Sequence, residues 1–114
     1  MGLPGDLSSA SRFVRAAFVK LNSVTEAGEE ASVGQFFHIL GSVAQPRGCV
    51  RLEDGSLEMT AYTSCINLDK GIYYYTTYQN SCVSAVELKK YRDKDALSLF
   101  PTVKNMILYK QNLD

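Results

Sequence analysis

The chain has 114 residues, 46% apolar and 21% charged, which suffices for one modest domain with a core. Twelve basic and twelve acidic residues give a formal net charge of zero, so the composition favours neither a nucleic acid nor an anionic membrane as partner. No apolar run is long enough to cross a bilayer, and no signal peptide opens the chain.

The cysteine pattern argues against a metal site. Cys49, Cys65 and Cys82 are too few and too scattered for a zinc framework. Their odd number argues against a complete disulfide set, although two of them could still pair on neighbouring strands. We therefore expect reduced thiols in a cytoplasmic protein that holds neither metal nor cofactor.

The first predicted element is a helix that follows a tight turn. Pro4 and Gly5 favour the turn, and the serines after it are good N-caps. Apolar residues then recur at helical spacing, which predicts a helix from about Ser9 to Asn22. Arg12 breaks this pattern, because it places a cation near the positive end of the helix dipole, on the side away from the apolar stripe.

A second amphipathic helix is expected over residues 31–43, before Pro46 and Gly48. The polar stretch Thr25–Glu30 reads as a loop or a frayed helix start. From Cys49 the apolar period changes to two, which indicates strands. The strand candidates are Leu57–Ile66, Ile72–Tyr78, Cys82–Leu88, the short Ala96–Phe100 and one more over Asn105–Lys110.

Two helices followed by an antiparallel meander predict an α+β fold, with both helices packed on one face of the sheet. The tyrosines 73, 74, 75 and 78 could form a stacking platform for a base or a sterol, but packing of the sheet is the favoured interpretation. His38, the only histidine, is expected on a polar helix face without a role. The acidic residues 26, 29 and 30 lack metal-ligand spacing.

Several motifs resemble the choloylglycine hydrolase family, which includes the conjugated bile salt hydrolases and the penicillin V acylases. They are Leu-Pro-Gly-Asp with two serines and Ser-Arg-Phe-Val-Arg-Ala-Ala-Phe, then residues 35–43, 62–65 and 69–75. Residues 1–114 resemble the C-terminal part of a single family domain. The resemblance implies a four-layer αββα N-terminal-nucleophile hydrolase sandwich, to which this chain contributes one helical layer and part of one sheet.

The resemblance also implies an activity. Family members cleave linear amides with an N-terminal cysteine, here the amide of glycine- or taurine-conjugated bile acids. Met1 and Gly2 stand at the start of this chain, so we expect it to lack the nucleophile and to be inactive alone. A penicillin V acylase-like amidase and a non-catalytic truncated module stay open as alternatives. The implied partners are the conjugated bile acid, the missing N-terminal part and, at full length, further copies in a homo-oligomer.

The resemblance assigns two site residues. Arg12 matches the arginine beside the catalytic cysteine, where its guanidinium would favour the thiolate and position the amide. Composition alone would make it a solvated surface arginine. Arg15 is expected to be a surface or ion-pairing residue whose replacement is mild. Leu3, in the turn that lies near the cleft of the family, is expected to help line the substrate region.

Overall fold

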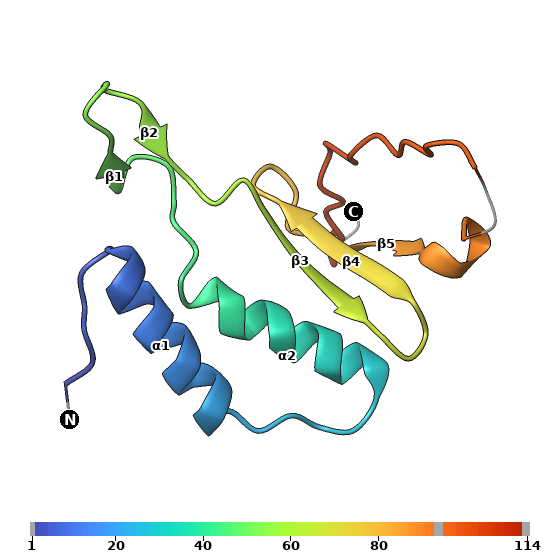
Figure 1. The fold of residues 1–114 in the computed structure, drawn as a ribbon, viewed down its shortest axis with the longest axis horizontal. Helices are drawn as coiled ribbons and strands as arrows, with labels where there is room; N and C mark the ends of the chain where they lie inside the picture. The colour runs from blue at the N-terminus through green and yellow to red at the C-terminus, as the bar shows by residue number, and fades with distance from the viewer. Residues whose placement is uncertain (1, 93–94, 113–114) are drawn as a thin grey trace. The chain divides into compact units, whose positions relative to one another are not determined.

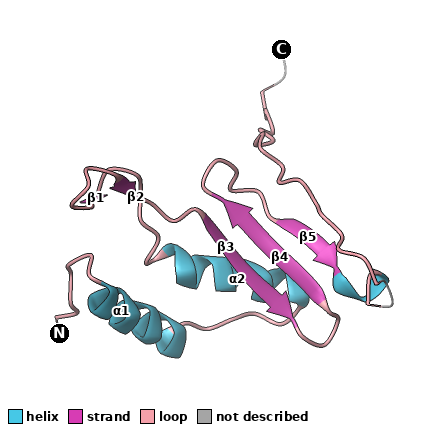
Figure 2. Ribbon diagram, turned by 45° about the horizontal axis from the view of Figure 1, so that its top comes forward, coloured by secondary structure: helices cyan, strands magenta, loops and turns pink. Residues whose placement is uncertain are grey.

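A computed structural model describes residues 2–92 and 95–112 (Figure 1). The chain forms two compact units, residues 1–60 and 61–114. Figure 2 shows their helices and strands. The elements are α1 (Ser9–Asn22), α2 (Glu29–Gly41), β1 (Val50–Arg51), β2 (Leu57–Glu58), β3 (Tyr62–Asn67), β4 (Ile72–Thr77), β5 (Ser84–Glu87) and the 3₁₀ turn η1 (Leu88–Lys90). The predicted α+β class is confirmed, whereas the assignment of residues 1–114 to one domain stays a prediction.

Helix α1 has the predicted bounds because its first turn is capped. The Ser8 hydroxyl accepts a hydrogen bond from the Ser11 N–H at 3.3 Å, and the Arg12 N–H donates to the Ser8 carbonyl at 2.9 Å. Capping of this kind satisfies donors that have no partner inside the helix. Arg12 is therefore the fourth residue of a helix with a well-defined start.

Helix α2 begins and ends earlier than the apolar pattern indicates. It starts at Glu29, within the stretch predicted as a loop or frayed start, after Gly28 with its positive φ of 110°. Two acidic residues in its first turn suit the helix dipole. The helix ends at Gly41, so Val43 lies outside it. This early end frees the Val43 carbonyl from the helix.

The predicted strand Leu57–Ile66 is wrong as a single element. It is divided into β2, which pairs antiparallel with β1, and β3, which belongs to the three-stranded sheet. The division falls near Thr60, whose backbone N–H donates to the Gln45 carbonyl at 3.0 Å. This hydrogen bond holds Thr60 against Gln45 within unit 1, and β3 begins only after it, at Tyr62.

In unit 2 the strands β3, β4 and β5 form an antiparallel sheet with β4 in the centre. The hairpin between β3 and β4 is closed by the Gly71 N–H, which donates to the Asn67 carbonyl at 2.8 Å. Gly71 has φ of 67°, the left-handed conformation that glycine adopts without steric cost. The predicted hairpin with glycine at this position is confirmed.

The two strands predicted last are wrong, because residues 96–100 and 105–110 form no strand in the described chain. The segment that contains them contacts the rest of unit 2 through scattered interactions instead of a ladder. The Asn80 side-chain amide donates to the Val103 carbonyl at 3.0 Å, and the rings of Tyr91 and Phe100 lie edge to face at 5.2 Å. An extended segment without a regular backbone partner is not a strand, whatever its composition.

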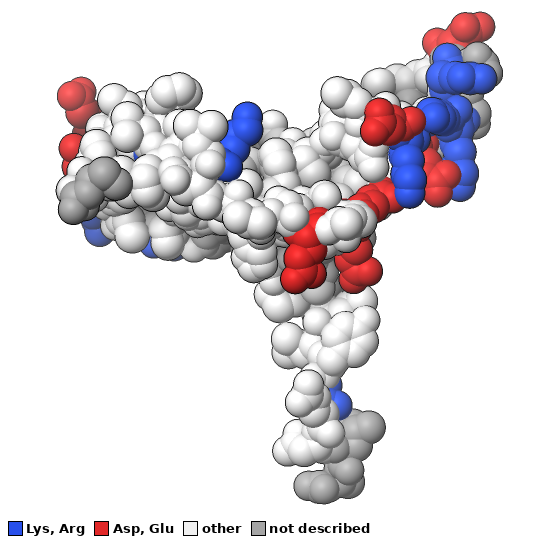
Figure 3. All heavy atoms as spheres, turned by 90° about the horizontal axis from the view of Figure 1, so that it is seen from below, with Lys and Arg blue, Asp and Glu red and all other residues white. Residues whose placement is uncertain are grey.

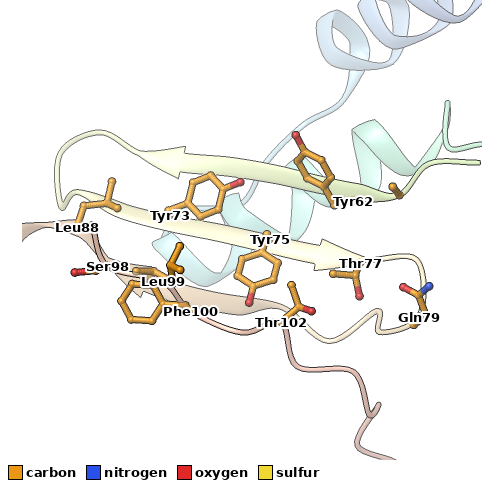
Figure 4. A pocket seen from close by; sticks show the side chains of 12 residues that line it. Tyr62, Tyr73, Tyr75, Thr77, Gln79, Leu88, Ser98, Leu99, Phe100 and Thr102 are labelled. Carbon is orange, nitrogen blue, oxygen red and sulfur yellow. The ribbon is translucent and has the colours of Figure 1, made fainter. Parts of the chain in front are cut away.

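This last segment covers part of one face of the sheet. Tyr73 and Tyr75 project from β4 toward Leu99 and Phe100, and the side chains enclose an open hollow of about 580 Å³ (Figure 4). The two tyrosine rings lie 6.0 Å apart. These contacts agree with the packing interpretation of the tyrosines.

Candidate functional site

The site is built around the guanidinium group of Arg12, in the first turns of α1. The Arg12 side chain is half-buried, and its Nε donates to the Val43 carbonyl at 3.0 Å. We assign the carboxamide of Gln45 with its oxygen toward Arg12, the orientation in which it accepts from Nη1 at 3.0 Å and from Nε at 3.3 Å. The opposite orientation would set amide donors against guanidinium donors. Arg12 is thus not a freely solvated surface arginine.

Both acceptors are neutral amide oxygens, so neither cancels the charge of the guanidinium. They occupy the Nε and Nη1 edge of the group. Within residues 2–92 and 95–112, no acceptor is bound to Nη2 of Arg12. The arrangement leaves a cation with donors available to an anion, which is the requirement for stabilising a thiolate or an oxyanion.

Arg15 holds the loop that precedes α1. Its Nη1 donates to the carbonyls of Pro4 at 3.1 Å and of Asp6 at 2.8 Å. Hydrogen bonds from Ser8, and lesser contributions that include the charge of Arg15, lower the pKa of Asp6 to about 2. Arg15 is therefore more than the surface or ion-pairing residue expected from the sequence. Leu3 lies in this loop and is 41% exposed.

Replacement of Arg15 with alanine should loosen this loop. Two hydrogen bonds from a charged donor are lost, which together are worth about 1–2 kcal/mol, so the loop should open about tenfold more often. Proteolysis follows the population of the open form when opening is fast. The rate of limited proteolysis between residues 2 and 8 should be about tenfold higher than in the protein without the substitution. An unchanged cleavage rate would contradict the assigned contacts.

The cysteines do not form a second centre. Cys49 is exposed, and Cys65 and Cys82 are half-buried. Burial raises the pKa of the Cys65 thiol, which disfavours the nucleophilic thiolate. His38 is exposed. In the part of the chain that the structure describes, no group of three His, Cys, Asp or Glu residues could hold a metal ion.

The surface carries no extended field of one sign in the view of Figure 3. Basic and acidic side chains lie together in one group there, the others stand apart or in small groups of one sign, and most of the visible surface is neither. Among the described helices, none has the length and apolar character needed to cross a membrane.

Comparison with known proteins identifies the family. Residues 1–98 match the linear amide C-N hydrolases of the choloylglycine hydrolase family. This chain belongs to the choloylglycine hydrolase family. The match includes Arg12, Val43 and Gln45, so all of the guanidinium site lies in the shared segment. Membership confirms the resemblance drawn from the motifs.

Bacterial bile salt hydrolases are among the relatives of this family member. A bile salt hydrolase/transferase from Lactiplantibacillus plantarum is 55% identical over 102 residues, which cover 89% of this chain and 32% of the relative. A conjugated bile acid hydrolase from Lactobacillus gasseri is 43% identical over 95 residues, 83% of this chain and 28% of the relative. The chain thus spans about a third of the length of the curated relatives it matches.

Solved structures agree with this choloylglycine hydrolase fold. A mutant conjugated bile acid hydrolase from Clostridium perfringens matches with a TM-score of 0.83 and 37% identity, over 98% of this chain and 34% of that chain. A penicillin V acylase from Agrobacterium tumefaciens has a TM-score of 0.63 over 78% of this chain and 28% of that chain. At 20% identity, the second likeness concerns the fold alone.

The sequence motifs indicated Arg12 but not the residues that hold it. Val43 was expected inside a helix, and Gln45 was not singled out. One signal was present: Gln45 precedes Pro46, and the residue before a proline favours extended backbone. A polar residue on an extended segment after a helix is a reasonable candidate for a long-range side-chain contact.

Proposed function

We propose that this chain is part of a bile salt hydrolase-like amidohydrolase that cleaves the amide of glycine- or taurine-conjugated bile acids. The observation that carries the proposal is the Arg12 guanidinium, which neutral acceptors hold along one edge. The relatives named bile salt hydrolases support the substrate class. The proposal places the nucleophilic cysteine in a segment outside the 114 residues.

In the proposed reaction, the cysteine thiolate attacks the amide carbonyl carbon and forms a tetrahedral oxyanion. The α-amino group of the cysteine, which took the proton of the thiol, passes this proton to the amide nitrogen, the C–N bond breaks, and the nitrogen leaves as the free amine of glycine or taurine. A thioester remains, which water hydrolyses to the bile acid and the thiol. Arg12 would contribute positive charge beside the thiolate and would orient the amide. Leu3 would line the substrate region from the loop held by Arg15.

We further propose that the whole enzyme works in the cytoplasm as a homo-oligomer. The three free cysteines agree with a reducing compartment. The immediate partner of this chain would be the N-terminal part of the same enzyme, which supplies the cysteine.

A chimera tests the proposed function. Residues 1–114 replace the matching segment of the Lactiplantibacillus plantarum relative, and the unaltered relative is the positive control. The chimera should release glycine or taurine from conjugated cholate, and thiol alkylation should abolish the release. A folded chimera that releases neither amino acid would contradict the proposal. Cleavage of penicillin V in preference to the bile salts would favour the acylase alternative.

A further inference from the structure

Gln45 combines two properties that a surface glutamine lacks. The residue is only 4% exposed. Its carboxamide oxygen accepts two hydrogen bonds from Arg12. A buried amide that lost such partners would carry a desolvation penalty, so the placement of this side chain depends on the guanidinium. The contact joins the segment after α2 to the first turns of α1.

The backbone of Gln45 is fixed as well. Its N–H donates to the Thr60 hydroxyl at 2.9 Å, and its carbonyl accepts from the Thr60 N–H at 3.0 Å. Pro46 restricts Gln45 further, because a proline disfavours the helical conformation in the residue before it. The backbone of Gln45 is therefore held in place, and so is the carboxamide that contacts Arg12.

A glutamate at this place would accept the same two hydrogen bonds but would bring a negative charge. An arginine paired with a carboxylate has less positive potential to offer a nearby anion. Glutamine and the Val43 carbonyl hold the guanidinium without that loss. The neutral acceptors thus orient the guanidinium of Arg12 without neutralising its positive charge.

We infer that Gln45 is a positioning residue for Arg12, which orients the guanidinium through neutral acceptors and leaves its charge and its Nη2 donors for the reacting centre. The inference rests on the proposed function. Gln45 itself contacts neither substrate nor nucleophile in this scheme. It acts through Arg12 alone.

The test uses two variants of the chimera. Gln45→Leu removes the acceptor, and kcat for glycocholate should fall about tenfold or more because the guanidinium loses its orientation. Gln45→Glu keeps shape and hydrogen bonding, so a merely structural role would leave it close to the parent. The inference instead predicts that Gln45→Glu lowers kcat and raises the pKa of the nucleophilic thiol, measured from the rate of iodoacetamide inactivation against pH.

Two controls distinguish the possible outcomes. Gln111→Leu, the same change at an exposed position, should leave kcat and the thiol pKa unchanged. In an Arg12→Ala background, Gln45→Leu should add no further loss, because the two residues act as one unit. An active chimera in which either Gln45→Leu or Gln45→Glu matches the parent overturns this inference alone. A folded chimera without activity overturns the proposed function, and the inference with it.

Discussion

Replacement of Arg12 with alanine should reduce kcat of the chimera for conjugated bile salts by about 10²–10³-fold. A preorganised donor at a developing negative charge is worth a loss of this order. The variant should still fold, because Arg12 contributes no apolar core. The Gln45 oxygen would lose its partners, which should cost about 1–3 kcal/mol of unfolding free energy. Steady-state release of glycine and a thermal melt of the same sample measure both effects.

Two comparisons sharpen this prediction. Arg12→Lys keeps the charge but not the planar fork, so it should restore activity only in part. Arg51→Ala removes an exposed arginine from β1 and is the matched control. Arg15→Ala is unsuitable for that purpose, because Arg15 holds the carbonyls of Pro4 and Asp6. Near-normal turnover in Arg12→Ala, or an equal loss in Arg51→Ala, would remove Arg12 from the mechanism.

The second large effect concerns the free 114-residue chain, which should not unfold cooperatively. Throughout residues 2–92 and 95–112, no apolar side chain is buried. Large apolar residues such as Leu21, 80% exposed, and Leu99, 81% exposed, lie open to solvent. Burial of apolar surface is the main favourable term in folding, and contiguous exposed apolar surface promotes association. We expect a broad thermal transition, strong dye binding and self-association.

Calorimetry, binding of a hydrophobic dye and sedimentation of the purified chain measure these properties. The chimera is the control, since its other segments can cover the exposed apolar side chains. It should show a sharp transition and little dye binding. A monomeric free chain with one sharp calorimetric peak would contradict the prediction.

Helix α1 and the β3–β4 hairpin were predictable because their signals are local. Ser8 caps the helix through a neighbouring residue, and Gly71 supplies the backbone conformation that the turn needs. The strand prediction Leu57–Ile66 failed for the opposite reason. Its interruption depends on the bond between Thr60 and Gln45, fifteen residues apart along the chain. An apolar pattern of period two does not indicate a hydrogen bond to a residue that is distant along the chain.

The same difference between local and long-range signals applies to the candidate site. Arg12 was conspicuous in the sequence because it breaks a helical rule, and the family motif reinforced it. The residues that hold it were not, because Val43 and Gln45 contact Arg12 across some thirty residues of chain. Their roles follow from where α2 ends, a boundary that the apolar pattern placed two residues too late.

The most direct test of the account measures what Arg12 does to the nucleophile. The rate of iodoacetamide inactivation is followed against pH in the chimera, with and without Arg12→Ala, in a Cys49→Ser background that removes the exposed thiol. A fixed guanidinium beside the thiolate should hold the thiol pKa at least about one unit lower in the parent than in Arg12→Ala. Superimposable pH profiles would contradict the account, because Arg12 would then exert no field on the reacting sulfur.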